Sequence, residues 1–210
     1  ILEYVNTTLT RMAYGGVFDH VGGGFSRYSV DTKWHVPHFE KMLYDNGQLV
    51  SLYAKAYAVT KDPLYKKVTE ETIAFVKNEL THSSGGFYSS LDADSLNEQG
   101  ELKEGAYYIW SKKELQELLN DDFEIFKDYY NINSYGAWEE DYVLIRDKSH
   151  SEVAEKHQLS TKELSTIIEN SLQILKKERQ KRPRPRLDDK ILTSWNGLML
   201  KGLIDAYRYL

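Results

Sequence analysis

Apolar residues recur every three to four positions in successive stretches of the 210-residue chain. This spacing places them along one face of an α-helix, so each stretch predicts an amphipathic helix. A helix is expected to follow Ser111, another to begin at Ser160 or Thr161, and the last to be capped by Thr193 or Ser194. The predicted helices cover residues 2–12, 42–56, 64–80, 111–119, 160–175 and 193–210.

Glycine-rich, aromatic stretches at residues 15–30 and 85–97 separate these helices, and residues 105–110 are expected to complete a hairpin with the second. Gly-Gly pairs followed by aromatic residues are typical of turns and short hairpins. No stretch is long enough to form the strands of a sheet core. A faint repeat of helices and Gly-Gly loops favours stacked helical hairpins over a bundle. The sequence therefore predicts an all-α fold of helical hairpins, with short β-hairpins in the interhelix loops.

The charge pattern argues against a nucleic-acid-binding protein. The formal net charge is −5, whereas binding to phosphates needs clustered Lys and Arg. The one basic run, residues 176–186, is interrupted by Pro183 and Pro185. We interpret it as a solvated helix end and linker, and we expect no nucleic-acid partner.

The chain contains no cysteine, which excludes disulfides, thiol catalysis and Cys-based zinc sites. No apolar run approaches the roughly 20 residues of a membrane span, and no signal-peptide pattern is present. We therefore expect a cytoplasmic protein with no membrane partner. Both ends of the sequence lie inside helical patterns, which predicts that the chain is part of a longer protein.

Polar and aromatic side chains are densest between residues 33 and 48, where a glycine-rich loop runs into a helix. Pro37 fits the first turn of a helix, so we expect this helix to begin near Pro37. His38 and Asp45 would then lie on nearly the same helix face. His38 is a candidate general acid or base, and Asp45 a candidate to orient it or to bind a hydroxyl. The alternative is a structural role, with His38 bridging to a loop and Asp45 in a salt bridge.

His35 and His38 also raise the question of a metal site. Helical zinc sites place the second histidine four residues after the first. Here the histidines are closer together and Pro37 lies between them. We therefore predict no metal site and no cofactor.

Asp92 and Asp94 form a second candidate pair. Carboxylates at alternate positions of an extended segment point the same way, and paired acids serve glycoside chemistry or the binding of sugar hydroxyls. The same two residues are equally suited to hydrogen bonds with loop backbone. Both interpretations remain open at the level of sequence.

Arg27 and Tyr28 follow three glycines, residues 22–24, which permit close approach of the backbone to a ligand. Arg27 is suited to bind a carboxylate or phosphate, or to form a structural pair with an aspartate. The glycines do not match a dinucleotide-binding fingerprint, since no strand precedes them and their spacing differs.

Other candidate ligand-binding residues combine rings, amides and acids, as sugar sites often do. Trp34 lies in the dense segment, while Trp195 and Asn196 would offer a stacking platform and an amide. Asp188 and Asp189 precede the last helix, where the helix dipole also favours acids for structural reasons.

Four motifs together resemble the family of spermatogenesis-associated protein 20 and its bacterial relatives. They lie at residues 22–31, 34–45, 86–95 and 187–199. This resemblance implies a thioredoxin-like domain followed by an (α/α)6 toroid, similar to N-acylglucosamine 2-epimerases and six-hairpin glycosidases. Residues 1–210 would then be one domain, the first part of the toroid, with the thioredoxin-like domain and the closing hairpins outside this chain.

The resemblance implies a carbohydrate-active toroid, either an epimerase or a glycosidase, with a sugar-like small-molecule ligand. His38 would be the acid or base, and Asp45, Asp92 and Asp94 would bind hydroxyls or take the second proton-transfer role. The alternative is a non-catalytic scaffold that binds a substrate or partner for the thioredoxin-like domain. Helix faces left open in a partial toroid also predict self-association.

Overall fold

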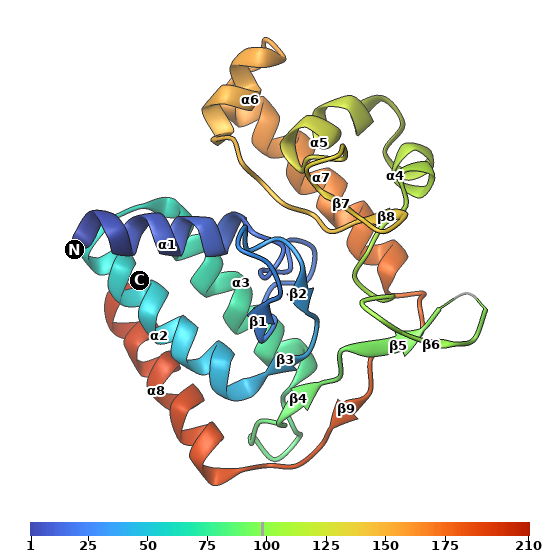
Figure 1. The fold of residues 1–210 in the computed structure, drawn as a ribbon. Coiled ribbons are helices and arrows are strands. Elements are labelled where there is room, and N and C mark those ends of the chain that lie inside the picture. The colour runs from blue at the N-terminus through green and yellow to red at the C-terminus, as the bar shows by residue number, and fades with distance from the viewer. Residues whose placement is uncertain (98) are drawn as a thin grey trace.

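The computed structural model describes residues 1–97 and 99–210, which form helices joined by short strands (Figure 1). The helices are α1 (Leu2–Tyr14), α2 (Leu43–Thr60), α3 (Pro63–Glu79), α4 (Lys112–Leu119), α5 (Phe123–Tyr129), α6 (His150–Lys156), α7 (Thr161–Arg179) and α8 (Thr193–Tyr209). The strands are β1 (Tyr28–Ser29), β2 (Pro37–His38), β3 (Lys41–Met42), β4 (Ser90–Leu91), β5 (Asp94–Leu96), β6 (Leu102–Glu104), β7 (Ala137–Trp138), β8 (Asp141–Tyr142) and β9 (Leu187–Asp188). The predicted all-α class, with helical hairpins and short β-hairpins in the interhelix loops, is confirmed.

Capping explains where some helices begin. Ser160 starts α7 with a capping box, in which its hydroxyl accepts from the Glu163 N–H at 3.2 Å and its own N–H donates to Glu163 Oε2 at 2.8 Å. The last helix differs from the prediction. Its N-cap is Leu192, which makes no side-chain cap bond, so Thr193 and Ser194 are not caps but the first residues of α8.

The segment that enters α2 is extended, so the expected helix start near Pro37 is wrong. Strand β2 pairs antiparallel with β1, and Tyr28 lies opposite His38. This pairing uses backbone groups that a helix from Pro37 would need, and α2 begins only at Leu43. His38 and Asp45 therefore do not share a helix face: one lies on a strand and the other in the first turn of α2.

Helices α2 and α8 pack side by side and run in the same direction (Figure 1). Two glycines bring their backbones together: a Cβ on Gly47 would lie 2.8 Å from Met199 Cα, and a Cβ on Gly202 would meet the Gly47 carbonyl. Further along the same seam, Ser51 Oγ donates to Asp205 Oδ2 at 2.5 Å. The close approach fixes how the two helices start relative to one another, and both begin at the same end of the fold.

Helices α1 and α3 complete this part of the fold, with α2 lying between α3 and α8 in Figure 1. Tyrosine hydroxyls join α1 to the other two helices. Tyr53 on α2 donates to the Leu9 carbonyl at 2.7 Å, and Tyr65 on α3 donates to the Asn6 carbonyl at 3.1 Å. Both tyrosines are at most 1% exposed, so each ring packs in the core while its hydroxyl remains hydrogen-bonded.

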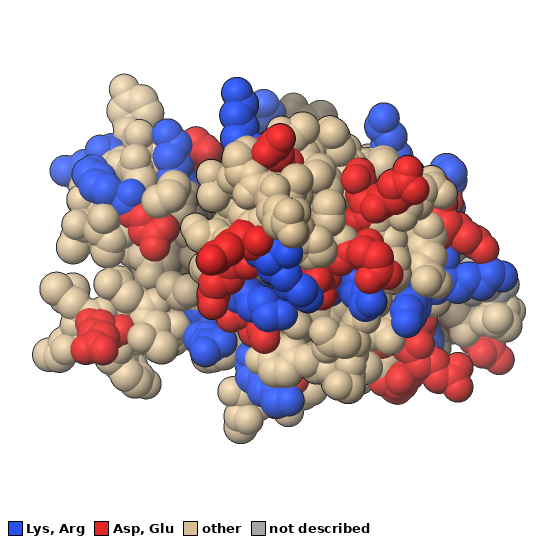
Figure 2. Space-filling view, turned by 90° about the horizontal axis from the view of Figure 1, so that it is seen from above, with Lys and Arg blue, Asp and Glu red and all other residues tan. Residues whose placement is uncertain are grey.

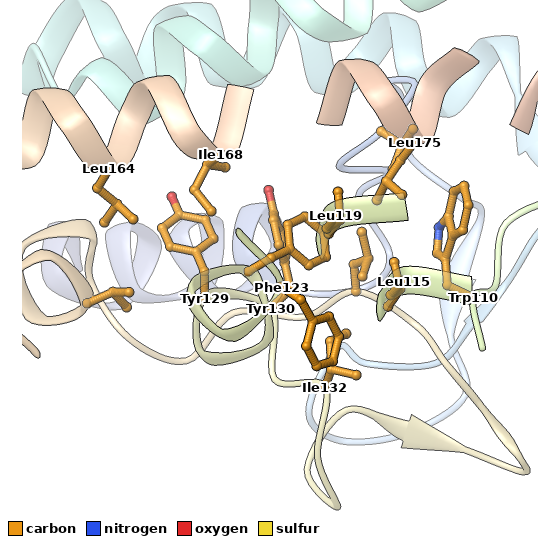
Figure 3. Close-up of a cluster of buried hydrophobic side chains, with 14 of the residues drawn as sticks. Trp110, Leu115, Leu119, Phe123, Tyr129, Tyr130, Ile132, Leu164, Ile168 and Leu175 are labelled. Carbon is orange, nitrogen blue, oxygen red and sulfur yellow. The ribbon is translucent and has the colours of Figure 1, made fainter. Parts of the chain in front are cut away.

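Helices α4 to α7 form a second lobe, inserted between α3 and α8 in the sequence (Figure 1). Its core contains Trp110, Leu115, Leu164 and Leu175, each 0% exposed (Figure 3). Burying a large apolar side chain contributes about 1.5–3 kcal/mol relative to leaving it exposed. The short helices α5 and α6 of this lobe were not predicted from the sequence.

A buried ion cluster joins the lobe to the loop after α1 and to strand β3. Arg179, at the end of α7, binds both oxygens of Asp19 at 2.8 and 2.9 Å, and Lys41 Nζ binds Asp19 Oδ2 at 2.7 Å. Burial alone would raise the pKa of Asp19, but the two cations outweigh it and hold that pKa well below its usual range. The interpretation of residues 176–186 as a solvated helix end is therefore wrong for Arg179, which is 5% exposed.

Candidate functional site

His38 lies at the centre of a polar cluster at the end of the fold where α2 begins. Its Nδ1 is 2.7 Å from Glu104 Oε1, and its Nε2 is 3.9 Å from Glu40 Oε2. The Tyr28 ring stacks on the imidazole, with centroids 5.1 Å apart and planes at 18°. The His38 side chain is 29% exposed, so it is held on one side and open to solvent on another.

Arg27 and Glu40 extend this cluster towards α2. Arg27 Nη1 is 3.4 Å from Glu40 Oε2, and the Arg27 N–H donates to the Glu40 carbonyl at 2.9 Å. Tyr44 raises the pKa of Arg27 most strongly, followed by the carboxylates of Glu40 and Asp45. Arg27 thus already contacts one carboxylate of the chain, that of Glu40 rather than an aspartate.

Asp45 is half-buried in the first turn of α2, and its Oδ2 is enclosed without a hydrogen-bond partner among the described residues. Burial raises the pKa of Asp45 to about 6; Arg27 opposes that rise and Glu40 adds to it. A buried acceptor without a donor costs free energy. Asp45 therefore keeps one enclosed carboxylate oxygen without a donor next to Arg27 and Glu40.

The hairpin of β5 and β6 brings Asp94 to the same cluster. Asp94 is the register partner of Glu104, which binds His38, and directly opposed side chains lie on the same face of a strand pair. Asp92 and Asp94 also line a hollow of about 250 Å³ together with Arg186. The structure thus places Asp94 one strand away from the His38 contact, and Asp92 at the adjoining hollow.

Trp195 reaches the site from the start of α8. Its ring meets the Tyr44 ring edge to face, with centroids 4.8 Å apart. Asn196 next to it acts on the loop before β4 instead: its side-chain oxygen accepts from the Phe87 N–H at 2.7 Å, and its NH₂ donates to the carbonyls of Phe87 and Leu192. Trp195 is therefore partly buried against the core and Tyr44, while most of the Asn196 amide is engaged by backbone.

Asp188 and Asp189 lie at and after β9. Asp188 is the register partner of Ser90 in the sheet β3-β4-β9, and its Oδ2 is 2.9 Å from Lys190 Nζ. The hydrogen bond from Lys190 lowers the pKa of Asp188. Asp189 is exposed. The sheet brings this pair to the end of the fold where α2 begins, since β3 leads directly into that helix.

Trp34 and His35 serve the packing of the loop rather than the cluster around His38. Trp34 packs beside α1, where a Cβ on Gly15 would lie 2.8 Å from its Cβ. His35 is 5% exposed, and its Nε2 is 3.1 Å from the Gly136 carbonyl. Burial lowers the pKa of His35, which favours its neutral form.

Charged side chains of both signs are interspersed on the face seen in Figure 2, with no single basic patch there. Within residues 1–97 and 99–210, no group of three or more His, Asp or Glu side chains is placed to hold a metal ion. No helix of that part of the chain is both long and apolar enough to cross a membrane.

Sequence reasoning missed three members of the cluster: Glu40, Tyr44 and Glu104. Glu40 and Tyr44 lie inside the dense segment, so the density of polar residues there was a usable signal. Glu104 is distant in sequence and reaches His38 only through the register of the β5–β6 hairpin. No local pattern in the sequence marks that contact.

No family model matches this chain. Several curated proteins are similar to it over most of its length. The chain is similar to human spermatogenesis-associated protein 20, with 40% identity over 93% of the chain and 28% of that protein. It is 38% identical to the uncharacterized protein B0495.5 of Caenorhabditis elegans, over 96% of the chain and 30% of that protein. These similarities confirm the resemblance predicted from the four motifs.

The chain thus spans less than a third of the length of these curated relatives. Among solved structures, it is similar to a cellobiose 2-epimerase from Spirochaeta thermophila, with a TM-score of 0.34 and 14% identity over 99% of this chain and 49% of that one. That similarity is too low to transfer an activity.

Proposed function

We propose that this chain is a carbohydrate-active helical domain. Its match to human spermatogenesis-associated protein 20 covers about 28% of the length of that protein. The ligand would be a sugar or a sugar-like small molecule, bound where β1, β2 and the first turn of α2 meet. The reaction class would be that of an epimerase or a glycosidase. His38 and Asp45 would carry the proton transfers, with Asp94 and Asp92 binding hydroxyls nearby.

The observation that carries this proposal is the unused oxygen of Asp45 beside a partly exposed histidine. Asp45 Oδ2 is enclosed without a donor, and the ring of Tyr44 next to it is in contact with Trp195. Sugar sites combine carboxylate acceptors for hydroxyls with aromatic rings for the apolar faces of the sugar. The cluster places a carboxyl group next to two aromatic rings.

The electrostatics suit acid–base chemistry. Because burial raises the pKa of Asp45 to about 6, this carboxyl group exchanges its proton closer to neutral pH than an ordinary aspartate does. His38 adds an imidazole, held by Glu104 at 2.7 Å. A carboxyl group and an imidazole are both side chains that can act as general acid or base.

Binding is tested by NMR titration of the full chain with glucose, N-acetylglucosamine and glucosamine. We expect saturable shifts at residues 27–28, 38–45 and 195. Asp45→Asn should weaken binding about tenfold, equivalent to about 1.4 kcal/mol, while Glu117→Gln, on the exposed surface of α4, should leave it unchanged. No saturable shift at the cluster with any of these sugars would overturn the proposal.

The second candidate function is a non-catalytic scaffold for another domain of the longer protein. The engagement of Asn196 by the Phe87 and Leu192 backbone favours it, as does the pairing of Asp188 with Lys190, because both remove expected ligand-binding groups from use. Hydrogen exchange on the full-length protein separates the two functions. Protection of residues 27–45 by the rest of the protein, without sugar binding, would support the scaffold.

A further inference from the structure

We infer that Glu104 is the positioning residue of His38, which fixes the tautomer of the imidazole and leaves Nε2 as the atom that faces a ligand. The inference adds a positioning residue to the proposed function. Only its consequence for catalysis rests on that function. Its structural half, the tautomer of His38, can be measured without any sugar.

The hydrogen bond itself determines where the proton lies. An ionised carboxylate accepts hydrogen bonds and donates none. His38 Nδ1 lies 2.7 Å from Glu104 Oε1, within the range of a charge-assisted hydrogen bond. Nδ1 must therefore carry the proton in the neutral ring, and Nε2 carries the lone pair.

The neighbouring carboxylate of Glu40 forms no hydrogen bond with Nε2. Glu40 Oε2 is 3.9 Å from Nε2, beyond hydrogen-bond distance, and lies 3.4 Å from Arg27 Nη1. The Tyr28 ring, at 18° to the imidazole plane, limits rotation of the ring about its long axis. A ligand hydroxyl at Nε2 would thus find an acceptor that is already oriented.

The position of Glu104 in the fold explains why it can hold this orientation. It lies on β6, paired in register with Asp94 on β5, so its backbone is fixed by the hairpin. Its side chain reaches from this hairpin to β2, across a sequence separation of 66 residues. A group on a separate, hydrogen-bonded element orients a catalytic histidine better than a flexible neighbour would.

The test is long-range ¹H–¹⁵N correlation NMR of the full chain, at a pH where the histidines are neutral. The His38 signals are assigned with His38→Gln, among the six histidines of the chain. We expect the Nδ1–H tautomer to predominate at His38. A predominant Nε2–H tautomer would overturn the inference.

Variants separate the hydrogen bond from the charge. Glu104→Gln removes the charge and presents both an acceptor oxygen and a donor NH₂, so it should lower the fraction of the Nδ1–H tautomer. Glu104→Ala removes the acceptor and should give a mixture of tautomers. Glu117→Gln is the control, since Glu117 is exposed on α4. An unchanged tautomer in Glu104→Ala, with the fold intact by circular dichroism, would also contradict the role of Glu104.

Failure of this inference is distinguishable from failure of the proposed function. If the tautomer follows Glu104 but no sugar binds, the sugar proposal fails and the orientation of His38 stands. If sugars bind the cluster but Glu104→Ala leaves the tautomer of His38 unchanged, only the positioning role of Glu104 is refuted. Where both hold, Glu104→Ala should weaken turnover more than binding, because the misplaced proton affects the reacting atom rather than the contacts.

Discussion

Gly202 of α8 lies directly against the Gly47 carbonyl of α2, leaving no room for a side chain between the two backbones. These parallel helices position the first turn of α2, which carries Asp45, relative to the first turn of α8, which carries Trp195. The geometry of the candidate site therefore depends on a backbone contact between two glycines that have no side chain in the site.

Gly202→Ala should destabilise the chain by about 1–3 kcal/mol, because the added methyl group meets backbone that cannot move aside. The free energy of unfolding in urea measures this. Gly197→Ala, also in α8, is the matched control: nothing lies within 4 Å of its added Cβ. Alanine there should stabilise the helix by up to about 1 kcal/mol. Equal effects at both positions would contradict the close packing of α2 and α8.

Asp19→Asn should destabilise the chain by about 3–5 kcal/mol, since it leaves Lys41 and Arg179 buried without their counter-charge. Urea denaturation measures the loss. Glu117→Gln removes the partner of Lys113 in an exposed pair and should cost at most about 1 kcal/mol. A small effect at Asp19 would mean that water reaches the ion cluster.

Asp45 should make stability depend on pH in the acid range. The folded chain holds the Asp45 proton up to a pKa of about 6, whereas the ordinary pKa of an aspartate is 3.8. Where the folded state binds more protons than the unfolded state, stability falls as pH rises. The contribution of Asp45 is therefore fully present below about pH 3.8 and is lost as pH rises through about 6.

Comparison of the wild-type chain with Asp45→Asn isolates the pH-dependent contribution of Asp45 to the free energy of unfolding. The free energy of unfolding of the variant, relative to the wild type, should increase between about pH 4 and pH 7. Asp121→Asn, on the exposed turn before α5, is the control and should show no such trend. A relative stability that stays level, or that decreases, would contradict the raised pKa of Asp45.

The outer face of α8 should cause self-association. Leu200, Ile204 and Tyr207 are 57%, 50% and 92% exposed and lie three to four residues apart, which places them on one stripe. Sedimentation velocity should detect dimers that increase with concentration, and the pair of changes Leu200→Lys and Ile204→Lys should abolish them. A chain that stays monomeric at high concentration would refute this expectation.

Long helices were predictable because their apolar residues repeat over several turns and their ends carry caps, as at Ser160. The entry to α2 was not, because Pro37 suits both a first helical turn and a short strand. Only pairing with β1, set by the tertiary fold, decides between the two. The seven-residue helices α5 and α6 are too short to show a period.

The candidate site was predictable where its residues are neighbours in sequence. His38 and Asp45 lie near Glu40 and Tyr44 because one short segment carries them all. Trp34 belongs to the same segment but packs beside α1, since adjacent positions there point to different parts of the core. Glu104 contacts His38 because of the register of the β5–β6 hairpin and its position in the tertiary structure. No local sequence pattern predicts that contact.

The inserted lobe has a consequence for folding kinetics. Ser51 and Asp205, which join α2 to α8, are 154 residues apart in the chain. Closing so long a loop costs conformational entropy and slows folding, whereas contacts within α4 to α7 are more local. A lobe that folds first shortens the effective loop and brings α8 within reach of α2. Mutations in its core, such as at Leu164, should therefore slow the pairing of two helices they never touch.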